Sequence, residues 1–417
     1  MGTAKRLILR DPIHGFIPLT ETERAIVDTP PIQRLRRIKQ LGLTDLVYPS
    51  AVHTRFAHSL GAMHVAGLMA EHLPSLSEDD RRVARLCLLL HDVGHGPFSH
   101  LFDFICEAAT EKKYKHEPMG WEIIRRSKEI MDALGSDAPR VLEELSGGRS
   151  FVHDLISGGL DADKLDYLRR DSHHAGVAYG RFDFERILWT LDTDGARHIA
   201  VQEKGMDSIE GLRLARQQMH VQVYTHHTRL VADRMLCRIA TLFVSDFPGE
   251  RRWFKYEPTA AGSERILSFD DAGLLQRLEA KAKGPARDLL DRLTSRRLPK
   301  RGYEVSVGDM PVDAEADITS GKLPLDDLEE EVAKAVHVPR HLVFAIAPRI
   351  DMKQYHGMAS GEPILVKLRN GAIKEFGKVE WVQAEANSPV RKLYVFGPEE
   401  SWKAIEKASI NYLRGYV

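Results

Sequence analysis

The segment from Leu88 to His100, LLLHDVGHGPFSH, changes abruptly from apolar residues to a run rich in histidine. His91 and Asp92 stand side by side where the change occurs. Burying a carboxylate at the end of an apolar helix is costly unless a positive group meets it. That group could be His91 itself, pairing with Asp92 or capping the helix, or it could be a bound metal ion.

Other segments offer the additional ligands that a metal ion would need. Arg55 and His58 lie one helical turn apart in HTRFAHSLGAMHVAGLMAEHL, and Asp163 belongs to DADKLDYLRRD. Taken alone, His58 is more typical of a satisfied core histidine. Together with His91 and Asp92, however, these residues provide two imidazoles and two carboxylates. Mixed nitrogen and oxygen ligands suit Mg²⁺, Mn²⁺, Fe²⁺ or Zn²⁺ and differ from a thiolate site.

Two helical segments place polar side chains at positions i, i+4 and i+8, so that each set shares one helix face. The sets are Asp163, Tyr167 and Asp171, with Lys164 adjacent, and Arg216, His220 and Tyr224. Either face could be a solvated stripe. The acid, phenol and acid of the first set differ from an ordinary amphipathic surface and could contact a ligand.

The elements that must position these residues follow from helix signals. Ser77 followed three residues later by Asp80 is a capping-box pattern, and apolar residues then recur at helical spacing. We expect this helix to end near Gly94, which can adopt the left-handed cap conformation, before Pro97 prevents continuation. His91 therefore falls in the last turn of the helix.

Three regions are predicted along the chain. Residues 1–49 contain a short hairpin in LILRDPIHGFIPLT and helix pieces split at Pro30 and Pro31, whereas residues 50–245 are helical. Residues 246–417 are predicted to form an α+β lobe and to mediate oligomerisation. Its strands are HLVFAIAPRI, EPILVKLRN and RKLYVFG, and its closing helix is EESWKAIEKASINYL. The expected fold class is mainly α.

Composition is ordinary for a globular protein. The 417 residues carry a formal net charge of −1, and 43% are hydrophobic and 29% charged. No apolar run reaches the ~18 residues of a membrane span, and the start lacks an apolar signal core. Three cysteines, Cys87, Cys106 and Cys237, form neither a disulfide framework nor a zinc motif. We therefore expect a cytoplasmic protein with no membrane partner, while a local basic patch for nucleic acid stays open.

The order H…HD…D, formed by His58, His91-Asp92 and Asp163, occurs within longer distinctive motifs. These are DPIHG, QRLRRIKQLG, HTRFAHSLG, HDVGHGPFSHLFD, KHE and DADKLDYLRRD. From about Ile8 to Arg238 the chain resembles the HD-domain deoxynucleoside triphosphate triphosphohydrolases, especially the branch with the animal SAM-and-HD-domain enzyme and its bacterial relatives. The resemblance implies an HD-domain helical core that binds one or two divalent metal ions through these four residues.

The resemblance also implies roles around the metal. Further active-site positions are matched by His95, His100, Asp103 and His116. Among these, His100 is expected to be the general acid, paired at i, i+3 with Asp103. Triphosphate-holding positions are matched by Arg55, Lys164 and Arg216. The positions around the sugar and base are matched by Gln40, Leu41, Tyr167 and Asp171, and His220 and Tyr224 are further expected substrate contacts. The implied substrate is a deoxynucleoside triphosphate (dNTP), cleaved to deoxynucleoside and triphosphate.

The same branch implies a homo-oligomer, a dimer or a tetramer, activated by GTP or dGTP between subunits. Guanine-reading positions are matched by Asp28, Gln33 and Arg36, and phosphate-holding positions by Arg186 and Lys204. Leu7 and Gln202 stand where the family pattern has a lysine and an arginine. Losing two cations weakens a site for a trianion, so we expect activation to be weaker or replaced by a constitutive state.

Two alternatives remain open from the residues. The same ligand set permits another HD enzyme, such as a nucleotidase, a cyclic-nucleotide phosphodiesterase or a single-strand nuclease. The second alternative is a non-catalytic HD scaffold that senses nucleotides. Metal content together with turnover of dNTPs and labelled single strands would separate these functions.

Overall fold

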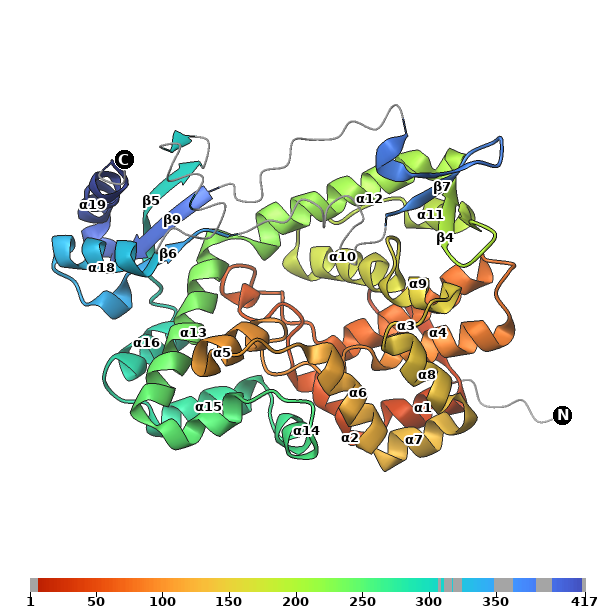
Figure 1. Cartoon of the computed structure of the whole chain (residues 1–417), viewed down its shortest axis with the longest axis horizontal. Coiled ribbons are helices and arrows are strands. Elements are labelled where there is room, and N and C mark those ends of the chain that lie inside the picture. Colours follow the sequence, from red (N-terminus) through yellow and green to blue (C-terminus); the bar gives the residue numbers. More distant parts are fainter. Residues whose placement is uncertain are drawn as a thin grey trace.

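The chain is mainly helical, which confirms the predicted fold class (Figure 1). A computed structural model describes residues 7–306, 309–310, 317, 325–348, 363–379 and 392–414. The helices up to the middle of the chain are α1 (Glu21–Val27), α2 (Pro30–Arg34), α3 (Arg55–Glu71), α4 (Glu78–Leu90), α5 (Leu101–Thr110), α6 (His116–Arg126), α7 (Lys128–Leu134), α8 (Ala138–Leu145), α9 (Phe151–Ser157), α10 (Ala162–Ala175) and α11 (Phe184–Trp189). The later α-helices are α12 (Met206–Met219), α13 (His227–Asp246), α14 (Ala260–Leu267), α15 (Asp271–Lys281), α16 (Gly284–Thr294), α18 (Leu325–Val336) and α19 (Trp402–Arg414).

Helix α3 lies at the centre of the helical body and packs against α4 and α10. Its apolar side chains, such as Met63 and Val65, are fully buried in the main core. The predicted capping box opens α4: the Ser77 hydroxyl accepts from the Asp80 N–H, and the Asp80 carboxylate accepts from the Ser77 N–H. The helix ends at Leu90, so the polar residues that follow lie directly beside α3 and α10.

The predicted N-terminal hairpin is confirmed. Strands β1 (Leu7–Asp11) and β2 (Gly15–Leu19) pair antiparallel, with Asp11 opposite Gly15. Gly15 has a φ of +74°, which glycine adopts at little cost. Helices α1 and α2 follow, and Pro30 and Pro31 occupy the first positions of α2, where a missing N–H costs nothing. The chain therefore turns before the two prolines.

The long helical pattern around Arg216 is interrupted. Helix α12 ends at Met219, a π-helical turn spans His220–Tyr224, and α13 begins at His227. The extra residue of a π-helical turn rotates the side chains after it. The expectation that Arg216, His220 and Tyr224 form one straight α-helical face is therefore wrong.

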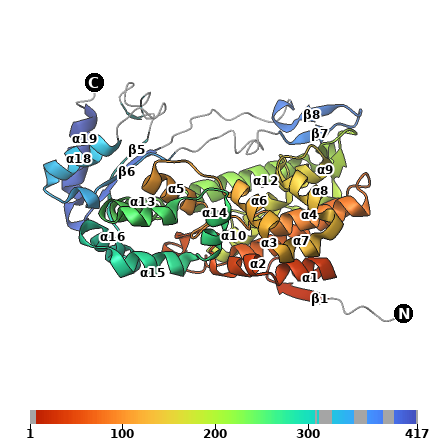
Figure 2. The same cartoon turned by 60° about the horizontal axis from the view of Figure 1, so that its bottom comes forward.

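The C-terminal part of the chain lies in three places. Helices α14 to α16 join the main core with α13. Strands β7 (Leu365–Lys367) and β8 (Ile373–Glu375) extend a sheet begun by β3 (Leu191–Thr193) and β4 (Ile199–Gln202), in the order β3-β4-β7-β8. Strands β5 (Lys300–Ser306), β9 (Lys392–Gly397) and β6 (Phe344–Ile346) form a second sheet beside α18 and α19. Figures 1 and 2 show the two sheets at opposite ends of the molecule.

The predicted strands and closing helix of this part are confirmed as β6, β7, β9 and α19, although residues 349–350, 362 and 391 of the predicted strands lie outside the described residues. The division of the chain at residue 246 stays a prediction. The sheet of β5, β9 and β6 has a small core of its own, which includes Leu328, Val395 and Ile405, whereas α14 to α16 belong to the main core.

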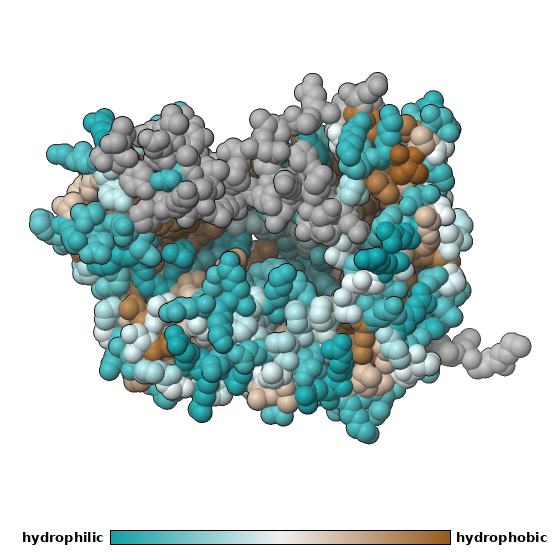
Figure 3. Space-filling model, in the orientation of Figure 1, coloured by the Kyte–Doolittle hydropathy of each residue, from teal (hydrophilic) through white to brown (hydrophobic). Residues whose placement is uncertain are grey.

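The face drawn in Figure 3 is largely hydrophilic, with a hollow near its middle. Within the described ranges, no helix has the length and apolar character needed to cross a membrane.

Candidate active site

The four predicted metal ligands come together. His58 lies on α3, His91 and Asp92 follow α4, and Asp163 lies on α10. The Asp163 Oδ1 atom is 2.8 Å from His58 Nε2 and 3.6 Å from His91 Nε2, and Asp92 Oδ1 is 3.3 Å from His91 Nε2. One ligand atom from each of His58, His91 and Asp163 lies within 4.8 Å of the other two. Three separate elements therefore present their donor atoms to one point.

The donor atoms also have the chemistry that a metal ion requires. His91 Nδ1 lies 2.7 Å from the Leu88 carbonyl oxygen, which can only accept, so Nδ1 carries the proton. The other nitrogen, Nε2, is buried and has no hydrogen-bond partner among the described residues. An unpaired buried imidazole nitrogen beside two carboxylates fits a divalent cation.

Charges at this point are strongly coupled. Burial alone would lower the pKa of His58, but hydrogen bonds and charges of Asp163 and Asp166 outweigh it and raise the pKa to about 10. Burial would raise the pKa of Asp163, yet the close contact with His58 Nε2 and the charges of His58 and His91 hold that pKa well below its usual range. In the free protein His58 thus keeps a proton on Nε2, at the position where a metal ion would bind.

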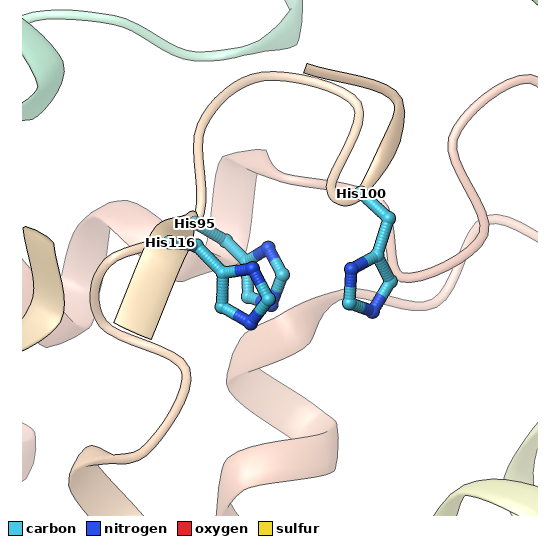
Figure 4. A group of neighbouring side chains, drawn as sticks. All are labelled: His95, His100 and His116. Atoms are coloured by element: carbon cyan, nitrogen blue, oxygen red, sulfur yellow. The ribbon is translucent and has the colours of Figure 1, made fainter. Parts of the chain in front are cut away.

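Beside the four ligands lies a second cluster, formed by His95, His100 and His116 (Figure 4). The rings of His95 and His116 stack with centroids 3.6 Å apart, and the His100 ring lies 4.7 Å and 5.0 Å from them. His95 Nε2 is 3.2 Å from Asp92 Oδ1, so the two clusters adjoin. These nitrogens could bind a second cation or phosphate oxygens.

The predicted pair of His100 and Asp103 is wrong. Asp103 Oδ2 lies 3.2 Å from His116 Nδ1, and the structure describes no bond from Asp103 to His100. His100 is the N-cap residue of α5, a position from which a side chain can reach i+3, as Ser77 does at α4, but the His100 side chain takes another direction. Its ring turns toward His95 and His116 instead. The Asp103 carboxylate therefore orients His116.

The loop between α4 and α5 is held in an uncommon conformation. Phe98 and Ser99 have φ angles of +60° and +63°, which non-glycine residues rarely adopt. Asp271 of α15 accepts a 2.7 Å hydrogen bond from the Phe98 N–H, and the Ser99 hydroxyl accepts one of 2.8 Å from Arg55 Nε and donates one of 2.5 Å to the Lys39 carbonyl. Sequence reasoning missed Asp271, because nothing local marks a contact across 173 positions.

The cations expected to hold phosphate occupy different environments. Arg55 is buried and its Nη1 lies 2.5 Å from Asp92 Oδ2, while its Nη2 has no partner among the described residues. Arg216 is buried with its Nε equally unpaired within the described part. The Lys164 ammonium pairs with Asp161 and donates a 3.0 Å hydrogen bond to the Gly158 carbonyl. Two guanidinium groups thus retain donors for an anion.

A polar wall surrounds Asp171. Its Oδ1 lies 2.8 Å from His53 Nε2, and its Oδ2 accepts a 2.6 Å hydrogen bond from the Tyr224 hydroxyl. The Tyr167 ring lies 6.4 Å from that of Tyr224 and 6.5 Å from that of His58. His53 was not predicted, and its only signal was its position two residues before Arg55 in the HTRFAH motif.

The remaining predicted substrate contacts lie near this wall. The Gln40 N–H donates a 2.9 Å hydrogen bond to the His53 carbonyl, and its buried Oε1 has no partner among the described residues. Leu41 is buried. The ring of His220 lies 5.0 Å from that of Tyr224, within the π-helical turn. Gln40 and His220 thus contact His53 and Tyr224, the two partners of Asp171, and Leu41 follows Gln40 in the chain.

The residues predicted to read a guanine nucleotide form local groups. Arg36 Nε donates a 2.8 Å hydrogen bond to Gln33 Oε1 and its guanidinium lies 3.6 Å from the centre of the Phe56 ring, while Asp28 is exposed. Arg186 donates a 3.1 Å hydrogen bond to the Lys204 carbonyl.

Both departures from the family pattern are neutral residues. Leu7 begins β1, and Gln202 ends β4 with its amide 3.4 Å from Asp192 Oδ2. Neither side chain supplies a cation.

Comparison with known proteins agrees with this arrangement. A family model described as the HD domain matches residues 55–168, and one described as the HD associated region matches residues 182–414, more than half of the chain. An uncharacterised protein of Methanocaldococcus jannaschii is 43% identical over 234 residues, covering 55% of this chain and 48% of that protein. The deoxynucleoside triphosphate triphosphohydrolase SAMHD1 of Homo sapiens is 34% identical over 271 residues, covering 55% of this chain and 43% of that protein.

A crystal structure of a phosphohydrolase from Bacteroides thetaiotaomicron superposes with a TM-score of 0.76 at 25% sequence identity, covering 94% of this chain and 100% of that one. The chain spans about half the length of the curated relatives it matches. With its HD domain, its HD associated region and its converging histidines and aspartates, the chain belongs to the HD-domain phosphohydrolase family.

Proposed function

We propose that the protein is a metal-dependent hydrolase that cleaves dNTPs to deoxynucleoside and inorganic triphosphate. The observation that carries this proposal is the convergence of His58, His91, Asp92 and Asp163 on one point, directly beside Arg55. Two imidazoles and two carboxylates suit a divalent cation, and the adjoining guanidinium suits phosphate. The printed activity of the SAMHD1 relatives supports the choice of substrate.

Each group then has a defined task. A bound divalent cation lowers the pKa of water and offsets phosphate charge. Arg55 and Arg216 donate to the triphosphate through their unpaired nitrogens, with Lys164 nearby on α10. His95 lies beside Asp92, and His116 is oriented by Asp103. Both imidazoles would contact the phosphate groups of the bound substrate.

His100 is proposed as the acid that protonates the departing sugar oxygen. In the free protein its pKa lies well below the usual range, since surrounding atoms restrict its hydration and the Arg55 charge opposes protonation, although part of the residue is exposed. A polyphosphate anion bound beside it would favour the protonated ring. The His100 ring would therefore carry the proton that it donates only when the substrate is bound.

The proposed sugar-facing side would favour deoxynucleotides over ribonucleotides. Asp171, held by His53 and Tyr224, would accept from the 3′-hydroxyl, while the Tyr167 ring would occupy the space beside C2′. A 2′-hydroxyl would then clash or stay unpaired. Gln40, Leu41 and His220 would contact the base and sugar.

Regulation and assembly are part of the proposal. Asp28, Gln33 and Arg36 would read GTP or dGTP, and Arg186 and Lys204 would contact its phosphates at an interface between copies of the chain. Because Leu7 and Gln202 supply no charge, this activation would be weaker than the family pattern implies or replaced by a constitutive state. A cytoplasmic location stays a prediction from the sequence.

Product analysis tests the proposal directly. Purified protein with Mn²⁺ or Mg²⁺ should release equal amounts of deoxynucleoside and inorganic triphosphate from dGTP or dATP, as measured by ion-exchange chromatography. Release of orthophosphate or pyrophosphate would contradict the reaction. Cleavage of labelled single strands without dNTP turnover would support a nuclease, and metal binding without any turnover would support a nucleotide-sensing scaffold.

A further inference from the structure

The buried side of the His58 ring faces a carboxylate that does not itself belong to the ligand set. Asp166 Oδ2 lies 2.7 Å from His58 Nδ1, and Asp166 is fully buried. Arg170 donates hydrogen bonds to both oxygens of this carboxylate, so the carboxylate is the acceptor and His58 Nδ1 is the donor. A carboxylate behind a metal-binding histidine fixes the tautomer and the orientation of the ring.

Asp166 is itself held by two other side chains. Arg170, one helical turn later on α10, donates to both oxygens, with Nε and Nη2 each at 2.9 Å. His14 Nε2 lies 2.6 Å from Asp166 Oδ1. The same Arg170 donates a 2.7 Å hydrogen bond from Nη1 to Asp11 Oδ2. The orientation of Asp166 thus depends on the N-terminal hairpin.

The turn of that hairpin is built to present His14 inward. Asp11 Oδ1 accepts hydrogen bonds of 2.9 Å and 3.0 Å from the N–H groups of Ile13 and His14, and Gly15 closes the turn with positive φ. Only 2% of the His14 side chain is exposed. The motif DPIHG therefore supplies both an anchor for Arg170 and a donor for Asp166.

Gly61 on α3 makes room for this contact. A Cβ atom at Gly61 would lie 2.0 Å from Asp166 Oδ1 and 2.2 Å from Arg170 Nη2, both impossible distances in a packed protein. The helix that carries His58 therefore approaches Asp166 and Arg170 closely only because residue 61 lacks a side chain.

We propose that the turn from Asp11 to Gly15 is a positioning element for the metal centre. His14 and Asp11 fix Asp166, directly and through Arg170, and Asp166 fixes the ring of His58. The inference rests on the proposed metal-dependent function. It assigns His14 a role in metal affinity although His14 does not contact the metal ligands.

Three variants of the full chain test this role: His14→Ala, His14→Gln and His72→Ala. A glutamine amide at position 14 can still donate to Asp166. His72 is the matched control, since it caps the far end of α3 and its Nδ1 bonds the Leu68 carbonyl. Mn²⁺ affinity is measured by isothermal titration calorimetry, and the coordination geometry by the visible absorption of bound Co²⁺.

His14→Ala should weaken Mn²⁺ binding by up to roughly 10-fold, the low end of the effect of losing a direct partner of a ligand, because His14 acts through Asp166, and it should change the Co²⁺ spectrum. His14→Gln should restore most of the affinity, and His72→Ala should match wild type. The proposed role is overturned if His14→Ala binds Mn²⁺ as tightly as wild type, or if His14→Ala and His72→Ala weaken binding equally. A wild-type chain that binds no divalent cation would instead overturn the proposed function.

Discussion

The candidate active site and the residues predicted to read a guanine nucleotide differ in how far their contacts reach along the chain. The first joins residues more than a hundred positions apart, as in the contacts of His58 with Asp163 and Asp166. The described contacts of Gln33 and Arg36 stay within the N-terminal segment and α3. Arg186 donates a hydrogen bond to the carbonyl of Lys204, 18 positions away. One site has its donors assembled within a single chain, whereas the other consists of two local groups.

This difference has a physical meaning. The catalytic donors are fixed by buried hydrogen bonds, so the cost of ordering them is met when the chain folds. Arg36 is exposed although its guanidinium contacts Gln33 and Phe56, and Asp28 is exposed, so a ligand or a second copy would have to order them. We therefore expect changes at the first site to affect chemistry outright and changes at the second to affect only regulation.

The largest effect should come from His91→Ala. Its Nδ1 bond to Leu88 fixes the ring, and its Nε2 has no hydrogen-bond partner within the described part, so the variant loses a ligand with little other disturbance. Turnover should disappear, and Mn²⁺ affinity should fall by more than the roughly 100-fold upper range of outer-shell losses. Metal analysis after gel filtration and a dNTP turnover assay measure both.

Asp92→Ala should have the same effect on metal and turnover, and an additional cost in stability. Arg55 would lose its buried partner, and breaking such a pair typically costs about 3–5 kcal/mol. Urea unfolding separates the two effects. Retention of full metal content in both variants would show that the four-residue set is not a metal site.

His100→Ala should have the next largest effect. Loss of a general acid lowers turnover by roughly 10²–10⁴-fold, while the metal content should stay near that of wild type. Asp103→Asn should act through His116 and not through His100, because the Asp103 carboxylate contacts His116. If His100→Ala loses metal as fully as His91→Ala, His100 is a ligand and the acid must be sought elsewhere.

A smaller effect is expected in the choice of sugar. In the proposed arrangement Tyr167 would lie beside C2′ and Asp171 already contacts His53 and Tyr224, so a 2′-hydroxyl would find neither space nor a partner. A buried hydroxyl without a partner can reduce kcat/KM by roughly 10²-fold. Steady-state kinetics with dGTP and GTP measure this ratio, and equal values would contradict the proposed sugar contacts.

The comparison also separates what the sequence can predict from what it cannot. The start of α4 followed from its local capping box, although the helix ends at Leu90 and not near Gly94 as expected. The assignment of His58, His91, Asp92 and Asp163 as ligands came from the motifs shared with the HD family. Asp271, which bonds the loop after α4 from 173 positions away, has no local signal.

The errors have the same origin. The i, i+3 spacing of His100 and Asp103 predicted a pair, but the His100 ring lies against the rings of His95 and His116. The π-helical turn at His220–Tyr224, which carries the tyrosine that bonds Asp171, likewise cannot be seen in residue spacing. Contacts between distant segments decide such cases.

The smallest effect on the basal reaction should come from Arg36→Ala. Removing this guanidinium breaks its bond to Gln33 and its contact with Phe56, but leaves every bond of the metal ligands intact. Any stimulation of dATP turnover by dGTP should be lost, while metal content stays at the wild-type level. Light scattering with and without dGTP measures assembly in parallel. A wild-type chain that is a strict, fully active monomer would refute assembly, and an Arg36→Ala variant that keeps its dGTP response would remove Arg36 from the nucleotide-reading group. If the stimulation by dGTP is lost whenever the chain stays monomeric, the group of Gln33 and Arg36 and the group of Arg186 and Lys204 bind the nucleotide only at an interface between copies of the chain.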